Sequence, residues 1–150
     1  MQQQRPAAMG GRIVVMGCGR LGSRIAAMLD GEGAVVTVVD SDAYAFRRLP
    51  DNFRGHTVLG TGIDEDVLRR AGIEGANTFI AVTNDDNPNI MAAQIAQTVF
   101  HVPEIVVRVY DVARAEVYRE LGLKTICPTT IIADMVRAQV SVTASGRGGS

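Results

Sequence analysis

Short apolar runs alternate with longer segments of helical hydrophobic spacing along nearly the whole chain. Continuous apolar runs such as 13–16 and 34–39 predict strands buried on both faces, as in a parallel sheet. The six predicted strands span residues 12–16, 34–39, 56–59, 78–82, 104–109 and 124–127. The predicted helices begin near residues 20, 42, 64, 88, 111 and 129, and the last one runs to about 140. This alternation predicts an α/β fold with a doubly wound, parallel six-stranded sheet in the order 3-2-1-4-5-6.

Apolar residues recur with a helical period inside the predicted helices and define the faces expected to cover the sheet. They are Leu21, Ile25, Met28 and Leu29 in the first helix, and Ile90, Met91, Ile95 and Val99 in the fourth. Acidic residues precede several helices, where a carboxylate can cap the free N–H groups and compensate the dipole. Asp85 and Asp86 are expected to do this for the fourth helix, and Asp111 for the fifth.

The first predicted strand leads directly into a G-x-G-x-x-G sequence formed by Gly17, Gly19 and Gly22. The second strand is followed by Asp40, close to the separation of about 20 residues expected in the dinucleotide-binding fingerprint. In that fingerprint the glycines permit a tight turn, backbone approach to a pyrophosphate and close helix–strand packing. The order of strand, loop, helix and acid therefore favours a Rossmann-like nucleotide site over an incidental glycine turn.

Composition and charge exclude several other classes of protein. The 150 residues carry a formal net charge of −1, which gives no reason to expect nucleic-acid binding. No apolar run approaches the ~20 residues that span a bilayer, so no direct membrane insertion is expected. Two cysteines are too few for a disulfide framework, which fits a reducing cytoplasm. We expect a disordered lead over residues 1–11, one domain over 12–140, and a flexible Gly/Ser-rich tail over 141–150.

The chain offers little catalytic chemistry. His56 and His101 are isolated histidines, and no His, Cys or carboxylate cluster has metal-ligand spacing. The predicted nucleotide-binding fold uses nearly all of the residues, whereas a dehydrogenase also needs a substrate domain. We therefore expect a binding protein with no catalytic residue and no metal. The alternative is the cofactor-binding domain of an NAD-dependent oxidoreductase whose substrate domain is missing.

The last predicted helix, 129–140, carries a broad apolar stripe after the sixth strand, where little of the domain remains to cover it. The stripe contains Ile131, Ile132, Met135, Val136 and Val140. Either the helix folds back onto the edge of its own sheet, or it crosses to a second subunit, since a contiguous exposed apolar patch is typical of an interface.

Taken together, six motifs resemble the RCK N-terminal domain, also called TrkA-N or KTN. They lie at 17–22, 38–42, 60–62, 81–86, 107–109 and 122–128. That domain belongs to regulatory subunits of Trk- and Ktr-type potassium transporters and to potassium-channel gating rings, and the resemblance covers about 12–140. Members commonly continue into a second, ligand-binding RCK C-terminal domain, and the resemblance of these 150 residues does not extend to that domain.

The resemblance implies a non-enzymatic, cytoplasmic sensor of NAD(H) or ATP/ADP that regulates a membrane potassium transporter or channel. It also implies a homodimer formed through the 129–140 helix, able to assemble further into an octameric ring. Such a subunit would lie at the inner face of the plasma membrane through its partner. Ligand binding would regulate that partner by favouring one dimer geometry over another.

The family's phosphate-binding segment corresponds to the glycine loop of this chain. Its residues are Gly17, Cys18, Gly19, Arg20, Leu21 and Gly22. Their backbone would hold the phosphates at a helix N-terminus, and Cys18 would contribute only its backbone. Arg20 would either add a charge-assisted contact or lie as a solvated arginine in the first turn.

Asp40 is expected to accept hydrogen bonds from the ribose hydroxyls, with Ser41 beside it. A carboxylate repels a 2′-phosphate, and Ser41 and Asp42 supply no compensating cation, so NADP is disfavoured. Arg47 and Arg48 follow too late to flank the ribose directly and are expected on a solvated helix face.

The remaining site residues are expected at the carboxyl ends of the third, fourth and fifth strands. Gly60, Thr61 and Gly62 would border the adenine, and Thr83 and Asn84 would face the second half of the ligand across the crevice.

Arg108 ends the fifth strand near the same crevice, where it either contacts the ligand or pairs with Asp111 or Glu104. NAD(H) and ATP/ADP share adenosine and a diphosphate, so these residues leave both ligands open.

Overall fold

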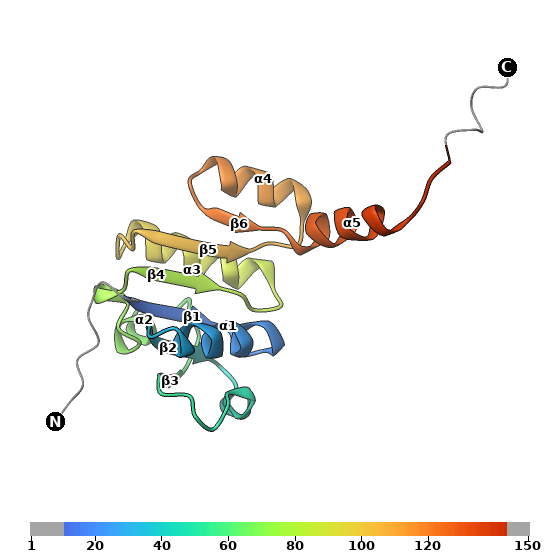
Figure 1. Ribbon diagram of the computed structural model, residues 1–150. Helices are drawn as coiled ribbons and strands as arrows, with labels where there is room; N and C mark the ends of the chain where they lie inside the picture. Colours follow the sequence, from blue (N-terminus) through green and yellow to red (C-terminus); the bar gives the residue numbers. More distant parts are fainter. Residues whose placement is uncertain (1–10, 144–150) are drawn as a thin grey trace, which may run out of the picture.

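The computed structural model describes residues 11–143, which fold around a six-stranded, all-parallel sheet. The strands lie in the order β3-β2-β1-β4-β5-β6, which confirms the predicted order (Figure 1). Their bounds are β1 Arg12–Met16, β2 Val35–Asp40, β3 His56–Leu59, β4 Thr78–Ala81, β5 Glu104–Arg108 and β6 Lys124–Ile126. At the centre, Val15 of β1 is in register with Val38 of β2 and Ile80 of β4.

Helices connect successive strands as the hydrophobic pattern predicts. The α-helices are α1 Arg20–Gly31, α2 Glu65–Arg70, α3 Asp86–Thr98, α4 Val112–Glu120 and α5 Pro128–Gln139. Two short segments are 3-10 helices, η2 Ala43–Arg48 and η3 Ile73–Gly75. Asp85 caps α3 and Asp111 caps α4 through their carboxylates, as expected. Asp86 instead accepts from the backbone N–H groups of Tyr110 and Asp111.

The sheet separates two apolar cores. On one face, α2, α3 and α4 pack against residues such as Val14 and Phe79; on the other, α1 and η2 pack against residues such as Val15 and Val38. The second layer is incomplete, because Ile126 of β6 lies beyond α1 and is 46% exposed. Part of this face of the sheet therefore has no helical cover within residues 11–143.

The helices approach the sheet through small residues more than through the large residues of the predicted stripes. Ala26 is fully buried in α1, whereas Met28 is 56% exposed. In α3, Ala92 and Ala93 are buried and Met91 is half exposed. The predicted inward orientation of Met28 and Met91 is therefore wrong, because small side chains allow the backbones to come closer than long ones do.

The last helix, α5, does not fold back to bury its apolar stripe. It has no buried residue, and it extends outward from the end of β6, away from the other helices (Figure 1). Its apolar residues are 45% to 64% exposed. Of the two expectations for this helix, folding back onto the sheet edge is wrong. The predicted lead over 1–11 and tail over 141–150 lie outside the described residues, apart from 11 and 141–143.

Candidate nucleotide-binding site

A cavity of about 450 Å³ opens at the carboxyl ends of the central strands. It lies where the chain order diverges from β1 towards β2 on one side and β4 on the other, the point at which doubly wound sheets bind ligands. The lining residues are Met16, Gly17, Gly19, Val39, Asp40, Ser41, Asp42, Ala45, Arg48, Gly60, Thr61, Gly62, Thr83, Asn84, Asp85 and Pro88. The sequence-predicted residues in this set come from the ends of four strands, which the fold brings together.

The glycine loop turns tightly from β1 into α1. Gly17 has a positive φ of 109°, and its N–H donates to the Val39 carbonyl at 2.8 Å. A side chain on Gly22 would overlap the Gly17 carbonyl oxygen, so the helix can begin this close to the strand only with glycine there. Gly19 is different, because a Cβ there would meet no atom within 4 Å and its φ of −77° suits any residue.

The N-terminus of α1 has no side-chain cap. Its N-cap residue is Gly19, whereas α2, α3 and α4 are capped by Asp64, Asp85 and Asp111. The N–H groups of the first turn of an α-helix have no intrahelical partners, and they carry partial positive charge. Because Gly19 lines the cavity, this helix end can present those groups to an anion such as a phosphate.

Asp40 connects the end of β2 to the glycine loop. Its Oδ2 accepts from the Cys18 N–H at 2.7 Å, and its Oδ1 accepts from the Asp42 N–H at 2.8 Å. A carboxylate oxygen can accept more than one hydrogen bond, so both retain capacity for the hydroxyl groups of a ligand. Asp40 thus fixes the loop as well as lining the cavity, a structural role that its position in the sequence does not reveal.

Cys18 is buried beneath this loop and its thiol does not line the cavity. Burial, with a smaller contribution from the Asp40 carboxylate, raises the pKa of the Cys18 thiol to about 11. A thiol with that pKa is protonated at neutral pH and is a poor nucleophile. The thiol is therefore not a candidate for reaction, and the Cys18 N–H is already bonded to Asp40.

Arg48 is a cavity residue that the sequence interpretation missed. The 3-10 helix η2 returns towards the glycine loop, so that Arg48 lines the cavity and its Nη1 lies 3.5 Å from the Cys18 carbonyl oxygen. Arg47 does lie on the outer face, where its guanidinium stacks on Tyr44. Arg48 is the only Lys or Arg among the lining residues, beside three aspartates. Residues three apart lie on the same face of a 3-10 helix, so the burial of Ala45 places Arg48 on the side of η2 that faces the cavity.

Arg108 pairs with neither Asp111 nor Glu104. It is buried, and its guanidinium donates to the Thr83 carbonyl and to Asn84 Oδ1. Glu104 bonds instead to Lys124, at 2.6 Å, and to Thr78. Those hydrogen bonds, the Lys124 bond first, hold the pKa of Glu104 below its usual value. Arg108 thus supports the rim of the cavity from behind.

Several predicted site residues do not line the cavity. Arg20 and Leu21 are exposed in the first turn of α1, and Gly22 is buried against Gly17. Leu21 and Arg108 line a second, apolar groove of about 340 Å³ between α1, the uncovered face of the sheet and the start of α5. Its other lining residues are Ile25, Ile80, Val82, Val106, Ile126, Pro128, Ile131 and Ile132.

Two features bear on membranes and metals. No helix in the described part of the chain is long and apolar enough to cross a membrane. Within residues 11–143, no three or more His, Cys, Asp and Glu side chains gather in a way that would hold a metal ion.

The sheet order, the glycine turn and the cavity at the switch point define a Rossmann-type nucleotide-binding fold. More narrowly, this chain belongs to the TrkA-N domain family, whose model matches residues 13–129.

Two relatives are both named Trk system potassium uptake protein TrkA. The one from Streptomyces coelicolor is 48% identical over 124 residues, which are 83% of this chain and 56% of that protein. The one from Halomonas elongata is 42% identical over 98 residues, which are 65% of this chain and 21% of that protein. The chain thus spans about half or less of the length of these relatives.

Solved structures share the fold at low identity. The TrkA-N domain of the Escherichia coli inner membrane protein ybaL has a TM-score of 0.76 at 18% identity, covering 87% of this chain and 96% of that one. GsuK bound to ADP has a TM-score of 0.72 at 24% identity, covering 89% and 34%. The AMP-bound Kef CTD of Shewanella denitrificans has a TM-score of 0.70 at 18% identity, covering 87% and 83%.

Proposed function

We propose that this chain is a nucleotide-sensing regulatory domain of a potassium uptake system and that its ligand is NAD(H) or ATP/ADP. The observation that carries the proposal is the uncapped N-terminus of α1, which opens through Gly19 onto a cavity that also contains Asp40. A helix N-terminus attracts phosphate, and a carboxylate at the end of the second strand suits a ribose diol. Relatives named for potassium uptake supply the physiological context.

In the proposed complex the first-turn N–H groups of α1 bind the diphosphate and Asp40 accepts from the ribose. Gly60 and Thr61 border the adenine, while Thr83 and Asn84 face the second half of the ligand. The three lining aspartates outnumber the single arginine, so the side chains of the cavity carry a net negative charge and backbone N–H groups must supply most of the attraction for phosphate. Neighbours described as bound to ADP and AMP support the choice of adenine nucleotides.

Regulation requires the ligand to distinguish two arrangements of the assembled protein, because equal affinity for both would shift nothing. We propose that those arrangements are dimers formed through α5, whose stripe is exposed in the single chain. The dimer would act, alone or in a larger ring, on a membrane potassium transporter or channel from its cytoplasmic side. This role needs no catalytic residue.

Calorimetric titration with ATP, ADP, AMP, NAD⁺, NADH and NADPH tests the proposal. We expect saturable binding of at least one adenine nucleotide that carries a diphosphate, and weaker binding of NADPH than of NADH because its 2′-phosphate would meet Asp40. AMP lacks the second phosphate and serves as the internal comparison. Absence of binding by all six compounds to the folded chain would contradict the proposed function.

A further inference from the structure

The end of β5 carries a buried guanidinium that supports the rim of the nucleotide cavity. Arg108 is 7% exposed, and its Nη2 donates to the Thr83 carbonyl at 2.7 Å and to Asn84 Oδ1 at 2.8 Å. Its Nε donates to the same carbonyl at 3.2 Å. Thr83 and Asn84 line the cavity while Arg108 does not. The position of the rim therefore depends on a residue that lies behind it.

Asn89 of α3 completes this network and is fully buried. Its Oδ1 accepts from the Thr83 N–H at 2.9 Å and the Thr83 hydroxyl at 2.7 Å. Its Nδ2 donates to the carbonyls of Thr83 and Arg108, each at 3.0 Å. A buried polar network in which each member is paired resists distortion of one part alone, because a buried group left without a partner destabilises the fold. The rim and the end of β5 are therefore expected to move together.

The other side of Arg108 faces the apolar groove. It lines that groove together with Ile131 and Ile132, the residues through which the start of α5 reaches it. Among the residues that line the groove, Arg108 alone has a side chain that hydrogen-bonds to the cavity rim. One side chain thus hydrogen-bonds to the rim of the proposed ligand site and lines the groove that the start of the proposed dimerisation helix also lines.

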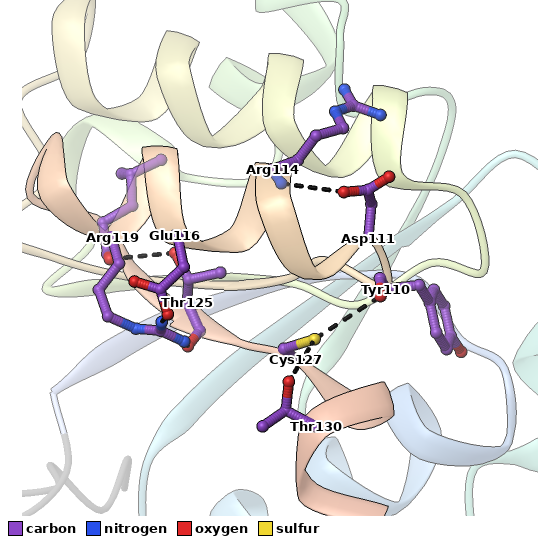
Figure 2. Close-up of polar contacts among 9 residues, drawn as sticks. Tyr110, Asp111, Arg114, Glu116, Arg119, Thr125, Cys127 and Thr130 are labelled. Atoms are coloured by element: carbon purple, nitrogen blue, oxygen red, sulfur yellow. Dashed lines mark hydrogen bonds and ion pairs between the residues drawn. The ribbon is translucent and has the colours of Figure 1, made fainter. Parts of the chain in front are cut away.

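The backbone that follows Arg108 makes a second connection to α5. Asp86, next to the lining residue Asp85, accepts from the N–H groups of Tyr110 at 2.8 Å and Asp111 at 3.1 Å. The Tyr110 carbonyl in turn accepts from the Thr129 hydroxyl at 2.9 Å and from the Cys127 thiol at 3.6 Å. Figure 2 shows Cys127 between the Tyr110 carbonyl and Thr130, where α5 begins.

We propose that Arg108 is a positioning residue that couples occupancy of the nucleotide cavity to self-association through α5. The inference rests on the proposed function and adds to it the residue that transmits the signal. A ligand that contacts Thr83 and Asn84 favours one setting of the rim, and Arg108 transfers that preference to the groove beside Ile131 and Ile132. Coupling of this kind is reciprocal, so dimer formation changes nucleotide affinity by the same factor.

The test measures the dimer dissociation constant by sedimentation equilibrium, with and without saturating NADH, and again with ADP. For the wild-type chain we expect at least one nucleotide to change that constant by about fivefold or more, the lower end of typical coupling. Arg108→Met keeps an apolar stem in the groove and removes the guanidinium, while Thr83 keeps its bond from Asn89. For this variant we expect the coupling ratio, which is the ratio of the dimer dissociation constants measured without and with nucleotide, to lie within about twofold of unity.

Arg114→Met is the matched control, because Arg114 also joins two elements, donating to Asn87 at 2.9 Å, but contacts neither rim nor groove. It should keep the wild-type ratio. Arg108→Lys is the second variant; it retains the charge but cannot form the three-bond fork, so its ratio should also fall. Circular dichroism checks that each variant is folded.

The proposal would be overturned if folded Arg108→Met or Arg108→Lys kept the wild-type ratio of dimer dissociation constants without and with nucleotide. It would also be overturned if these variants weakened nucleotide binding and left that ratio unchanged at saturation. Unfolding of both variants would assign Arg108 a purely structural role and also overturn it. A wild-type chain that binds nucleotide without any change in its self-association refutes the coupling and leaves the proposed ligand site intact. A wild-type chain that binds none of the nucleotides contradicts the proposed function itself.

Discussion

Replacing Gly19 with aspartate should abolish nucleotide binding while leaving the fold intact or slightly stabilised. The backbone there is extended, at φ −77° and ψ −163°, and a Cβ meets no atom within 4 Å, so the substitution introduces no strain. The new carboxylate would lie at the N-cap of α1 and occupy the N–H groups that we assign to phosphate. The side chain of residue 19 would then compete with the ligand for these N–H groups.

Gly19→Asp should raise the stability of the fold slightly and lower the affinity for nucleotide strongly. Aspartate instead of glycine at an N-cap gains a few tenths of a kcal/mol, and its interaction with the helix dipole adds about 0.3–1 kcal/mol. For a chain of this length, the Tm should be unchanged or up to about 4 °C higher. Loss of two charged hydrogen bonds to phosphate, at about 1.5–3 kcal/mol each, weakens binding by roughly 10² to 10⁴-fold.

The assay is calorimetric titration with NADH, ATP and ADP, alongside thermal unfolding followed by circular dichroism. Gly19→Asn is the matched control, because it has the shape of aspartate without the charge. Binding of all three nucleotides should fall together in Gly19→Asp, and by clearly less in Gly19→Asn. Wild-type affinity in the aspartate variant would refute the placement of the phosphates. Equal losses in the two variants would refute the role of charge.

Three further outcomes are expected. Asp40→Ala should weaken nucleotide binding about ten- to hundredfold, and unchanged affinity in the folded variant would contradict the ribose assignment. The same change should lower the free energy of unfolding by about 1–3 kcal/mol, because the buried Cys18 N–H loses its acceptor. Ile132 and Met135 are 58% and 64% exposed in the single chain, so replacing both with glutamate should leave the circular dichroism of the folded chain unchanged and raise the dimer dissociation constant. A dimer of wild-type strength would exclude α5 from the interface. The pKa of the Cys18 thiol is raised from 9.0 to about 11, so the thiol stays protonated in the folded state at a pH where it ionises in the unfolded chain. The free energy of unfolding should therefore fall by up to about 2 kcal/mol as the pH rises from 9 to 11. Urea unfolding of Cys18→Ala should lack this decrease, and a pH dependence identical to that of the wild type would refute the prediction.

The elements at the centre of the site could be predicted from sequence because their signals are local. Continuous apolar strands and a glycine turn need no distant partner to be recognised, and the acid at Asp40 follows its strand directly. Parallel strands joined by helices then allow few topologies, because crossover connections are right-handed. The order 3-2-1-4-5-6 and the convergence of strand ends on one cavity follow from these rules.

Contacts between segments far apart in the sequence could not be predicted in this way. The hydrophobic period identified the helices, but close packing buried Ala26 and Ala92 and left Met28 and Met91 exposed. Arg48 entered the cavity because η2 turns back towards the glycine loop, a matter of the geometry of a short 3-10 helix.

The sequence by itself determined the class of fold, the glycine loop and the acidic residue, because each depends on neighbouring residues and on backbone conformation. Only the tertiary structure decided that Arg108 bonds to Thr83 and Asn84, 25 and 24 residues earlier, in preference to Glu104 or Asp111. A buried guanidinium must be hydrogen-bonded, so it bonds to the acceptors that packing places beside it. Exposed carboxylates that are nearer in sequence do not satisfy it, because they lie outside the buried region. The same holds for α5, whose stripe could be read from the sequence but whose direction away from the sheet could not.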